Sequence, residues 1–219
     1  MTLQFPFQIT IDRQVGSGGA ELGQRIAGRL GFAYLDRQIL QQAAQELGMS
    51  EDQLAGRDER VQNFWVRMME SFSADSPEHL ICNPPFRIIS DDALIEAEQR
   101  VMLRLARRGS CVIVGRCGFH MLADIAPMLN VFVHASRSFR IERMIQHYAA
   151  ANETIAEEMI DSMDRIRERY VERISGVSWY DARNYHLSID LSQVGFDAAE
   201  AFVISLANRI FREAVPAVS

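Results

Sequence analysis

A run of glycines near the N-terminus places the strongest constraint on the fold. Gly16 to Gly19 follow a short apolar segment, Phe7 to Ile11, that predicts a β-strand. Apolar residues then recur at helical spacing from Leu22 to Leu30, and Gly31 ends the predicted helix. A strand, a glycine loop and a helix in this order suit phosphate binding, because glycines let backbone N–H groups approach an anion and the helix dipole favours negative charge.

The loop departs from the complete Walker A motif, G-x-x-x-x-G-K-[ST]. With Gly18 as the last glycine, Gly19 stands where the lysine would be and Ala20 replaces the hydroxyl residue. The chain has no lysine, and all 23 basic residues are arginine. Any cation that neutralises a phosphate here must therefore be an arginine or a metal ion. The loop alone leaves open a glycine-rich turn that only begins a helix.

Apolar segments and helical patterns alternate along the rest of the chain. This order predicts an α/β fold in which helical crossovers join parallel strands and cover both faces of the sheet. We expect one domain over residues 1–219, because no repeat or low-complexity linker interrupts the pattern. The expected strands are residues 7–11, 32–35, 111–114, 129–133 and 187–191.

Polar residues mark where several helices should begin. A helix is expected from Asp36 to about Leu54, and another begins at Asp91 and Asp92, where acidic residues suit the helix dipole. Ser136 or Ser138 can open the next helix. Two further starts have capping-box spacing: Thr154 with Glu157, and Asp197 with Glu200.

Composition excludes several classes of protein. The 219 residues carry a formal net charge of −6, which argues against broad nucleic-acid binding. No run of about 18 apolar residues predicts a membrane span, and the N-terminus lacks the pattern of a signal peptide. Three cysteines without regular spacing fit a reducing compartment, so we expect a cytoplasmic protein. The five histidines show no spacing typical of a zinc site, and no protein metal site is expected.

Four segments together resemble the cytidylate kinase-like family. They are Ile9 to Leu40 (ITIDRQVGSGG and onward), Cys111 to Leu122 (CVIVGRCGFHML), Leu129 to Met144 (LNVFVHASRSFRIERM) and Ile174 to Leu206. The resemblance implies a P-loop fold of three layers with a five-stranded parallel sheet, an acceptor-binding flap at about 41–90 and a lid at about 140–180. It implies transfer of the γ-phosphoryl group of ATP, with Mg²⁺, to a nucleoside monophosphate such as CMP.

The resemblance also assigns roles to individual residues. Asp161, Asp164 and Arg167 resemble the family's lid motif, D-x-x-D-x-x-R. Alternative roles stay open: a surface ion pair for Arg13, helix capping for Asp36, and a pair between Asp161 and Arg165 on a solvent-facing helix. The expected catalytic residues are Arg13, Arg116, Asp164 and Arg167; the ATP-binding residues are Gly16, Ser17, Gly18, Gly19, Arg140 and Arg143; and the acceptor-binding residues are Asp36, Arg37 and Arg116.

Two positions depart from the family's pattern. Ala20 stands where a basic residue often follows G-S-G-G, and Cys117 stands where aspartate typically follows the arginine at position 116. A thiol cannot supply two strong acceptors to a base. Two alternatives therefore accompany the CMP-kinase hypothesis: a catalytically impaired relative that binds a nucleotide for regulation, and a kinase of the same fold for another small acceptor. The sequence leaves the oligomeric state open, a homo-oligomer included.

Overall fold

A computed structural model describes residues 6–48, 91–124 and 127–214. The chain divides into two compact units, one of Met1–Asp36 with Met102–Ser219 and the other of Arg37–Val101. The expected flap at about 41–90 falls in the second unit, and its residues 49–90 lie outside the described residues. The same holds for the C-terminal part of the helix expected from Asp36 to Leu54.

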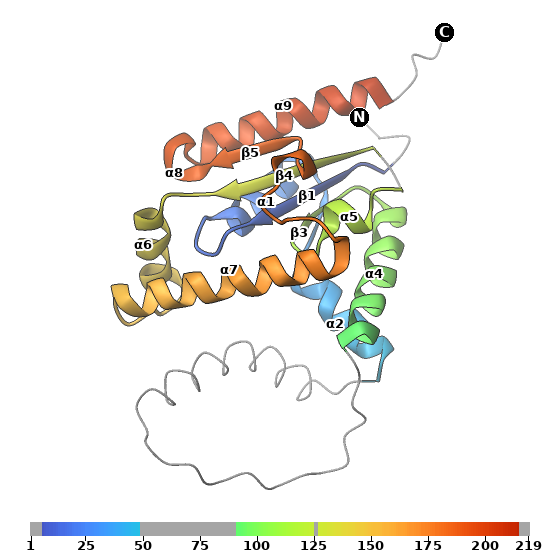
Figure 1. Ribbon diagram of the computed structural model, residues 1–219. Coiled ribbons are helices and arrows are strands. Elements are labelled where there is room, and N and C mark those ends of the chain that lie inside the picture. The colour runs from blue at the N-terminus through green and yellow to red at the C-terminus, as the bar shows by residue number, and fades with distance from the viewer. Residues whose placement is uncertain (1–5, 49–90, 125–126, 215–219) are drawn as a thin grey trace, which may run out of the picture. The chain divides into compact units, whose positions relative to one another are not determined.

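The first unit is built on a five-stranded sheet in which every neighbouring pair is parallel (Figure 1). The strand order is β2-β3-β1-β4-β5, so the strand before the glycine loop lies at the centre. This arrangement confirms the predicted parallel α/β fold. The strands are β1 (Gln8–Arg13), β2 (Ala33–Leu35), β3 (Cys111–Val114), β4 (Met128–His134) and β5 (Leu187–Asp190).

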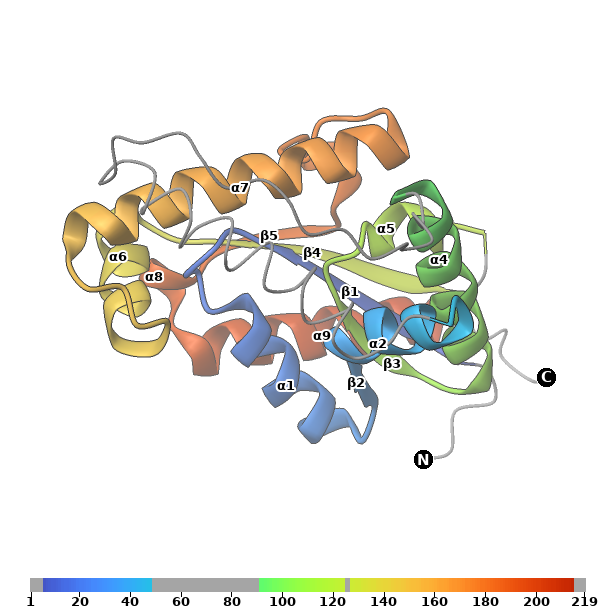
Figure 2. The ribbon, with the colours of Figure 1, turned by 90° about the horizontal axis from the view of Figure 1, so that it is seen from below.

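Helices α1 (Gly19–Leu30) and α9 (Phe196–Ala214) cover one face of this sheet. They lie side by side (Figure 2), and the Arg25 guanidinium of α1 contacts the Asp197 carboxylate of α9 at 3.0 Å. Ile9 and Ile11 of β1 are fully buried against them. Burial of such alternate strand residues is the main stabilising contribution of this layer.

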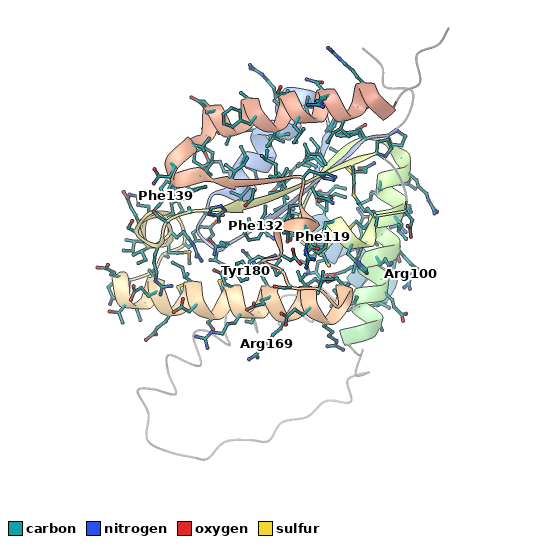
Figure 3. The ribbon with its side chains drawn as sticks, turned by 45° about the horizontal axis from the view of Figure 1, so that its top comes forward. Arg100, Phe119, Phe132, Phe139, Arg169 and Tyr180 are labelled. Atoms are coloured by element: carbon teal, nitrogen blue, oxygen red, sulfur yellow. The ribbon has the colours of Figure 1, made fainter. Side chains whose placement is uncertain are left out.

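Helices α5 (Gly118–Met121) and α7 (Glu153–Ser175) lie on the opposite face. An aromatic cluster packs between α7 and the sheet. In it, the rings of Phe132 and Trp179 lie edge-to-face with their centres 5.4 Å apart. Figure 3 shows Phe119, Phe132 and Tyr180 in this region, whereas Arg169 lies on the side of α7 that faces away from the sheet. The two layers of helices complete the three-layer arrangement.

The remaining elements connect these layers or belong to the second unit. In the second unit, Arg100 pairs with Glu46 at 4.0 Å. Among the described residues, no helix combines the length and apolarity that crossing a membrane requires. The remaining elements are α2 (Arg37–Glu46), α4 (Asp91–Arg108), α6 (Arg137–His147), the 3-10 helix η1 (Ala182–Asn184) and α8 (Leu191–Val194).

Two predicted helix starts need correction. Ser136 caps α6 as expected, accepting from Phe139 N. The N-cap of helix α7 lies two residues before Thr154, because Asn152 Oδ1 accepts from Ile155 N at 2.9 Å and asparagine is the stronger capping residue. Helix α9 begins at Phe196 directly after Gly195, so Asp197 lies inside its first turn and does not cap it.

Candidate functional site

The glycine loop needs its glycines for both conformation and space. Gly16 and Gly18 have φ of 75° and 88°, in the left-handed region that side chains disfavour. A Cβ at Gly16 would lie 2.8 Å from the Arg140 carbonyl oxygen of α6, and one at Gly18 would lie 2.8 Å from the Phe196 ring. Gly18 is also the N-cap of α1, so the loop opens onto the N-terminus of a 12-residue helix. This geometry is the one a phosphate group requires.

Backbone and hydroxyl hydrogen bonds close the start of the loop. Gln14 N donates to Val133 O of β4 at 3.0 Å, which ties the loop to the sheet. Ser17 Oγ donates to Gln14 O at 2.8 Å, and Ser17 N donates to the same oxygen at 3.3 Å. These hydrogen bonds fix the conformation of the chain where the loop begins.

Arg140 of α6 and Asp164 of α7 form a buried pair around Val15. Asp164 Oδ1 accepts from Val15 N at 2.8 Å, and Arg140 Nε donates to Val15 O at 2.7 Å. Arg140 Nη2 also donates to Asp164 Oδ2. The two residues are only 5% and 8% exposed. Their polar atoms serve the backbone at the start of the loop, which supports a positioning role for both.

Arg167, one helical turn after Asp164, holds the residue before the loop. Its Nη1 donates to Arg13 O at 2.8 Å. Burial, together with the nearby Arg13 guanidinium, lowers the pKa of Arg167. The lid motif thus reaches the backbone of residues 13–15 through Asp164 and Arg167. Asp161 instead hydrogen-bonds to Arg137, with Nη2 donating to Oδ2 at 3.0 Å, and this hydrogen bond, helped by the nearby Arg165 charge, lowers the pKa of Asp161.

Arg143 of α6 lies beside the first turn of α1. Its Nη2 donates to Glu21 Oε2 at 3.0 Å, and its guanidinium lies 5.4 Å from the centre of the Phe196 ring. Its Nε is buried and has no hydrogen-bond partner among the described residues. The Arg143 guanidinium therefore pairs with Glu21, the residue that follows Ala20 in the first turn of α1.

Arg13 ends β1 and extends along the carboxyl edge of the sheet. Its Nη2 lies 3.9 Å from Asp36 Oδ1, at the end of β2, and this pair is partly exposed. Tyr34 Oη donates to the other carboxylate oxygen of Asp36 at 3.4 Å. Burial, with the adjacent Asp36 charge, raises the pKa of Tyr34 to about 12, so this phenol stays protonated. Arg13 and Asp36 therefore meet, as the expected edge position requires.

Arg116 and Cys117 follow β3 in an unusual backbone conformation, with φ of 60° and 54°. Arg116 is half-buried at the same edge of the sheet. Cys117 is fully buried, and burial, with a contribution from Asp12, raises the pKa of its thiol to about 12. The thiol is neutral at physiological pH. Arg37 begins α2, and its side chain lies outside the description.

Sequence reasoning missed Asp12, a buried carboxylate in the central strand. Asp12 is 4% exposed and pairs in register with Phe132, whose ring contacts Trp179. Burial raises the pKa of Asp12 to about 6, although Arg13 and Arg167 act in the opposite direction. The sequence held a signal for this residue, because Asp12 follows Ile9 and Ile11 in the strand before the glycine loop and a carboxylate is rarely fully buried unless it is paired.

The profile of the cytidylate kinase-like family matches residues 8–193, most of the chain. The chain belongs to this family. A search of curated proteins found no match.

Solved structures share the fold at low sequence identity. An uncharacterized protein from Eubacterium ventriosum is 20% identical, with a TM-score of 0.67, over 92% of this chain and 98% of that one. A Thermus thermophilus protein is 13% identical, with a TM-score of 0.56, over 94% and 98%. Shikimate kinase from Bacteroides thetaiotaomicron is 10% identical, with a TM-score of 0.51, over 92% and 98%. These similarities establish the P-loop kinase fold alone.

Proposed function

We propose that this protein transfers the γ-phosphoryl group of ATP to a nucleoside monophosphate, with a CMP-like molecule as the acceptor. The observation that carries the proposal is the glycine loop, whose left-handed Gly16 and Gly18 open directly onto the N-terminus of α1. Family membership supports the same reaction class. A small-molecule nucleotide is thus the expected partner, in a cytoplasmic setting.

Arginines supply the positive charge that phosphoryl transfer needs. Catalysis of this reaction is mostly positioning and neutralisation of the phosphoryl oxygens. In our proposal the loop N–H groups of Gly16 to Gly19 bind the phosphates of ATP, and Arg13 and Arg116 act from the edge of the sheet. Arg143 adds charge beside α1. Arg140, Asp164 and Arg167 keep the loop in its binding conformation through the contacts to Arg13 and Val15.

The residues near the loop could supply only a few ligands to Mg²⁺, so the phosphates of ATP would have to supply others. The Walker hydroxyl is absent at Ala20, and the described residues contain no cluster of three metal-ligating side chains. Mg²⁺ commonly binds through one or two carboxylates plus the substrate phosphates. Asp12, which follows Ile11 and precedes Arg13, and Asp36, which pairs with Arg13, are carboxylates that could hold it, and when bound it would neutralise phosphate charge.

The acceptor would bind through Asp36, Arg37 and Arg116. The neutral, buried Cys117 thiol gives a base only weak hydrogen bonds. This observation favours, as a second candidate, a kinase of the same fold whose acceptor is not a cytosine nucleotide. A regulatory nucleotide-binding relative is the other alternative, and Gly19 with Ala20 favours it.

Heat denaturation with Mg²⁺ and ATP, GTP, CMP, dCMP, UMP or AMP tests the proposal, followed by an assay of ADP release for each stabilising pair. A ligand that binds only the native state raises the unfolding temperature by mass action. ATP and one monophosphate should each stabilise the protein and together release ADP. Stabilisation without turnover would favour the regulatory alternative, and Ala20→Arg should then leave activity at background. If no nucleotide stabilises the protein, the proposal is wrong.

A further inference from the structure

This loop differs from the Walker pattern at two positions. The pattern has a glycine at the first and a lysine at the second, whereas this chain has a basic residue at the first and a glycine at the second. With Gly18 as the last glycine of G-x-x-x-x-G-K-[ST], the first glycine falls at position 13 and the lysine at position 19. This chain has Arg13 and Gly19. The cation and the glycine have therefore changed places along the loop.

The structure places these two positions in contact. A Cβ built at Gly19 would lie 2.5 Å from Arg13 Cβ and 3.0 Å from Arg13 Cγ. Real side chains do not approach so closely, and Arg13 Cβ is fixed to the backbone of the central strand. The stem of Arg13 thus fills the space into which a side chain at position 19 would extend. A lysine at 19 and an arginine at 13 exclude each other.

A second glycine makes room for the charged end of Arg13. A Cβ at Gly115, which follows β3, would lie 2.2 Å from Arg13 Nη1. The guanidinium therefore lies over the Gly115 backbone, next to Arg116, at the carboxyl edge of the sheet. Its side chain is 18% exposed, and its carboxylate partner Asp36 is 3.9 Å away, too far for a strong hydrogen bond. Within the part of the chain that the structure describes, the Arg13–Asp36 pair therefore leaves guanidinium donors that could bind a ligand.

We propose that Arg13 is the catalytic residue that replaces the Walker lysine, with Gly19 and Gly115 as the two spaces that admit its side chain. This inference rests on the proposed function. In the reaction, the acceptor oxygen forms a bond to the γ-phosphorus while the bond from that phosphorus to the bridging oxygen breaks, and its electron pair leaves with ADP. Arg13 donates hydrogen bonds to the phosphoryl oxygens throughout the transfer.

The test is a double-mutant cycle of the full-length protein with Arg13→Gly, Gly19→Lys and the double variant. Arg13→Gly should lower kcat with Mg²⁺-ATP by about 10²–10³-fold, as loss of one preorganised donor typically does. The double variant should recover at least about tenfold of this loss, and only in part because Ala20 still lacks a hydroxyl. Arg29→Ala, which removes an exposed arginine of α1, should keep wild-type activity.

Thermal unfolding of the same four proteins gives a second readout that needs no nucleotide. Gly19→Lys should lower the unfolding temperature markedly when Arg13 is present and far less in the Arg13→Gly background. Equal effects in both backgrounds, or a double variant no more active than Arg13→Gly, would overturn the inference. If the wild-type protein neither binds nor turns over ATP, the proposed function fails and the catalytic role of Arg13 with it. The unfolding cycle then still decides whether the two positions share one space.

Discussion

The roles of some residues in this protein could be predicted from the sequence, whereas the roles of others depend on contacts that only the fold creates. The glycines of the loop could be assigned from sequence, because a left-handed backbone at a helix start is a local property. The importance of Gly115 could not, because it depends on where the Arg13 side chain lies in space. Asp12 was missed for a similar reason: its burial depends on how distant parts of the chain pack around β1, and not on its neighbours in the sequence.

Gly115→Ala should do more damage than the same change at a glycine with open surroundings. Gly115 and Gly176 have φ of 76° and 70°, but only a Cβ at Gly115 would meet another residue, Arg13. Gly176→Ala should cost about 1–2 kcal/mol from backbone strain alone. Gly115→Ala should cost a similar amount of stability, because Arg13 Nη1 is the far end of a flexible side chain, and should in addition lower turnover, because the guanidinium must move. Denaturant unfolding and initial rates measure both; unchanged rates would contradict the assigned contact.

Asp12 should make stability fall as pH rises from about 4 to 7. Burial raises the pKa of Asp12 to about 6, above the value of about 3.9 in an unfolded chain. The native state therefore binds the extra proton, and its contribution is complete at low pH and lost as pH rises through 6. The loss is on the order of 2–3 kcal/mol.

The control for this pH dependence is the Asp12→Asn variant, because asparagine has a similar shape to aspartate but does not ionise. Carboxylates with a lowered pKa, such as Asp181, act in the opposite sense at lower pH and are common to both proteins. The difference in unfolding free energy between wild type and variant, measured by urea at several pH values, should therefore isolate Asp12. A difference that stays constant from pH 4 to 7 would argue against a raised pKa.

Among the elements, α7 shows where pattern-based prediction succeeds and where it stops. Its existence follows from the sequence, and its motif residues Asp164 and Arg167 contact the backbone at the start of the loop. Their targets, the Val15 N–H and the Arg13 carbonyl, are backbone groups that no side-chain pattern reveals. The exact start of α7 was also not predicted from the sequence, because Asn152 and Thr154 are both acceptable N-cap residues.

Two asparagine substitutions on α7 should differ strongly in their cost. Asp164→Asn weakens a buried pair with Arg140 and should destabilise the protein by about 3–5 kcal/mol. Asp161→Asn changes the same residue type on the same helix, but its pair with Arg137 is exposed and should cost at most about 1 kcal/mol. Urea unfolding measures both, and similar costs would show that the buried pair does not hold the loop.

The corrected start of α7 has its own test. Asn152→Ala removes the acceptor for Ile155 N and should cost about 1 kcal/mol. Thr154→Ala should stay within about 0.5 kcal/mol, because Thr154 does not cap the helix. The reverse order, measured by thermal unfolding, would restore the capping box first inferred from Thr154 and Glu157.

At the scale of the whole molecule, the sheet followed from the order of elements, because parallel strands and right-handed crossovers leave few topologies. Prediction was weaker for residues 37–101, which the contacts separate as a unit of their own. In the sequence, that stretch lacks the regular alternation that identified the strands elsewhere. We infer that the acceptor is selected there, whereas ATP is bound by the other unit.

Hydrogen exchange can test this division of labour. Mg²⁺-ATP should slow exchange in peptides that contain residues 13–22, because phosphate contacts protect the loop amides and the first turn of α1. A monophosphate acceptor should slow exchange in peptides that contain Asp36, Arg37 or Arg116 and in peptides within 41–90, at concentrations that leave residues 13–22 unchanged. Protection of the same peptides by both ligands would mean that donor and acceptor compete for the loop, and that residues 41–90 do not choose the acceptor.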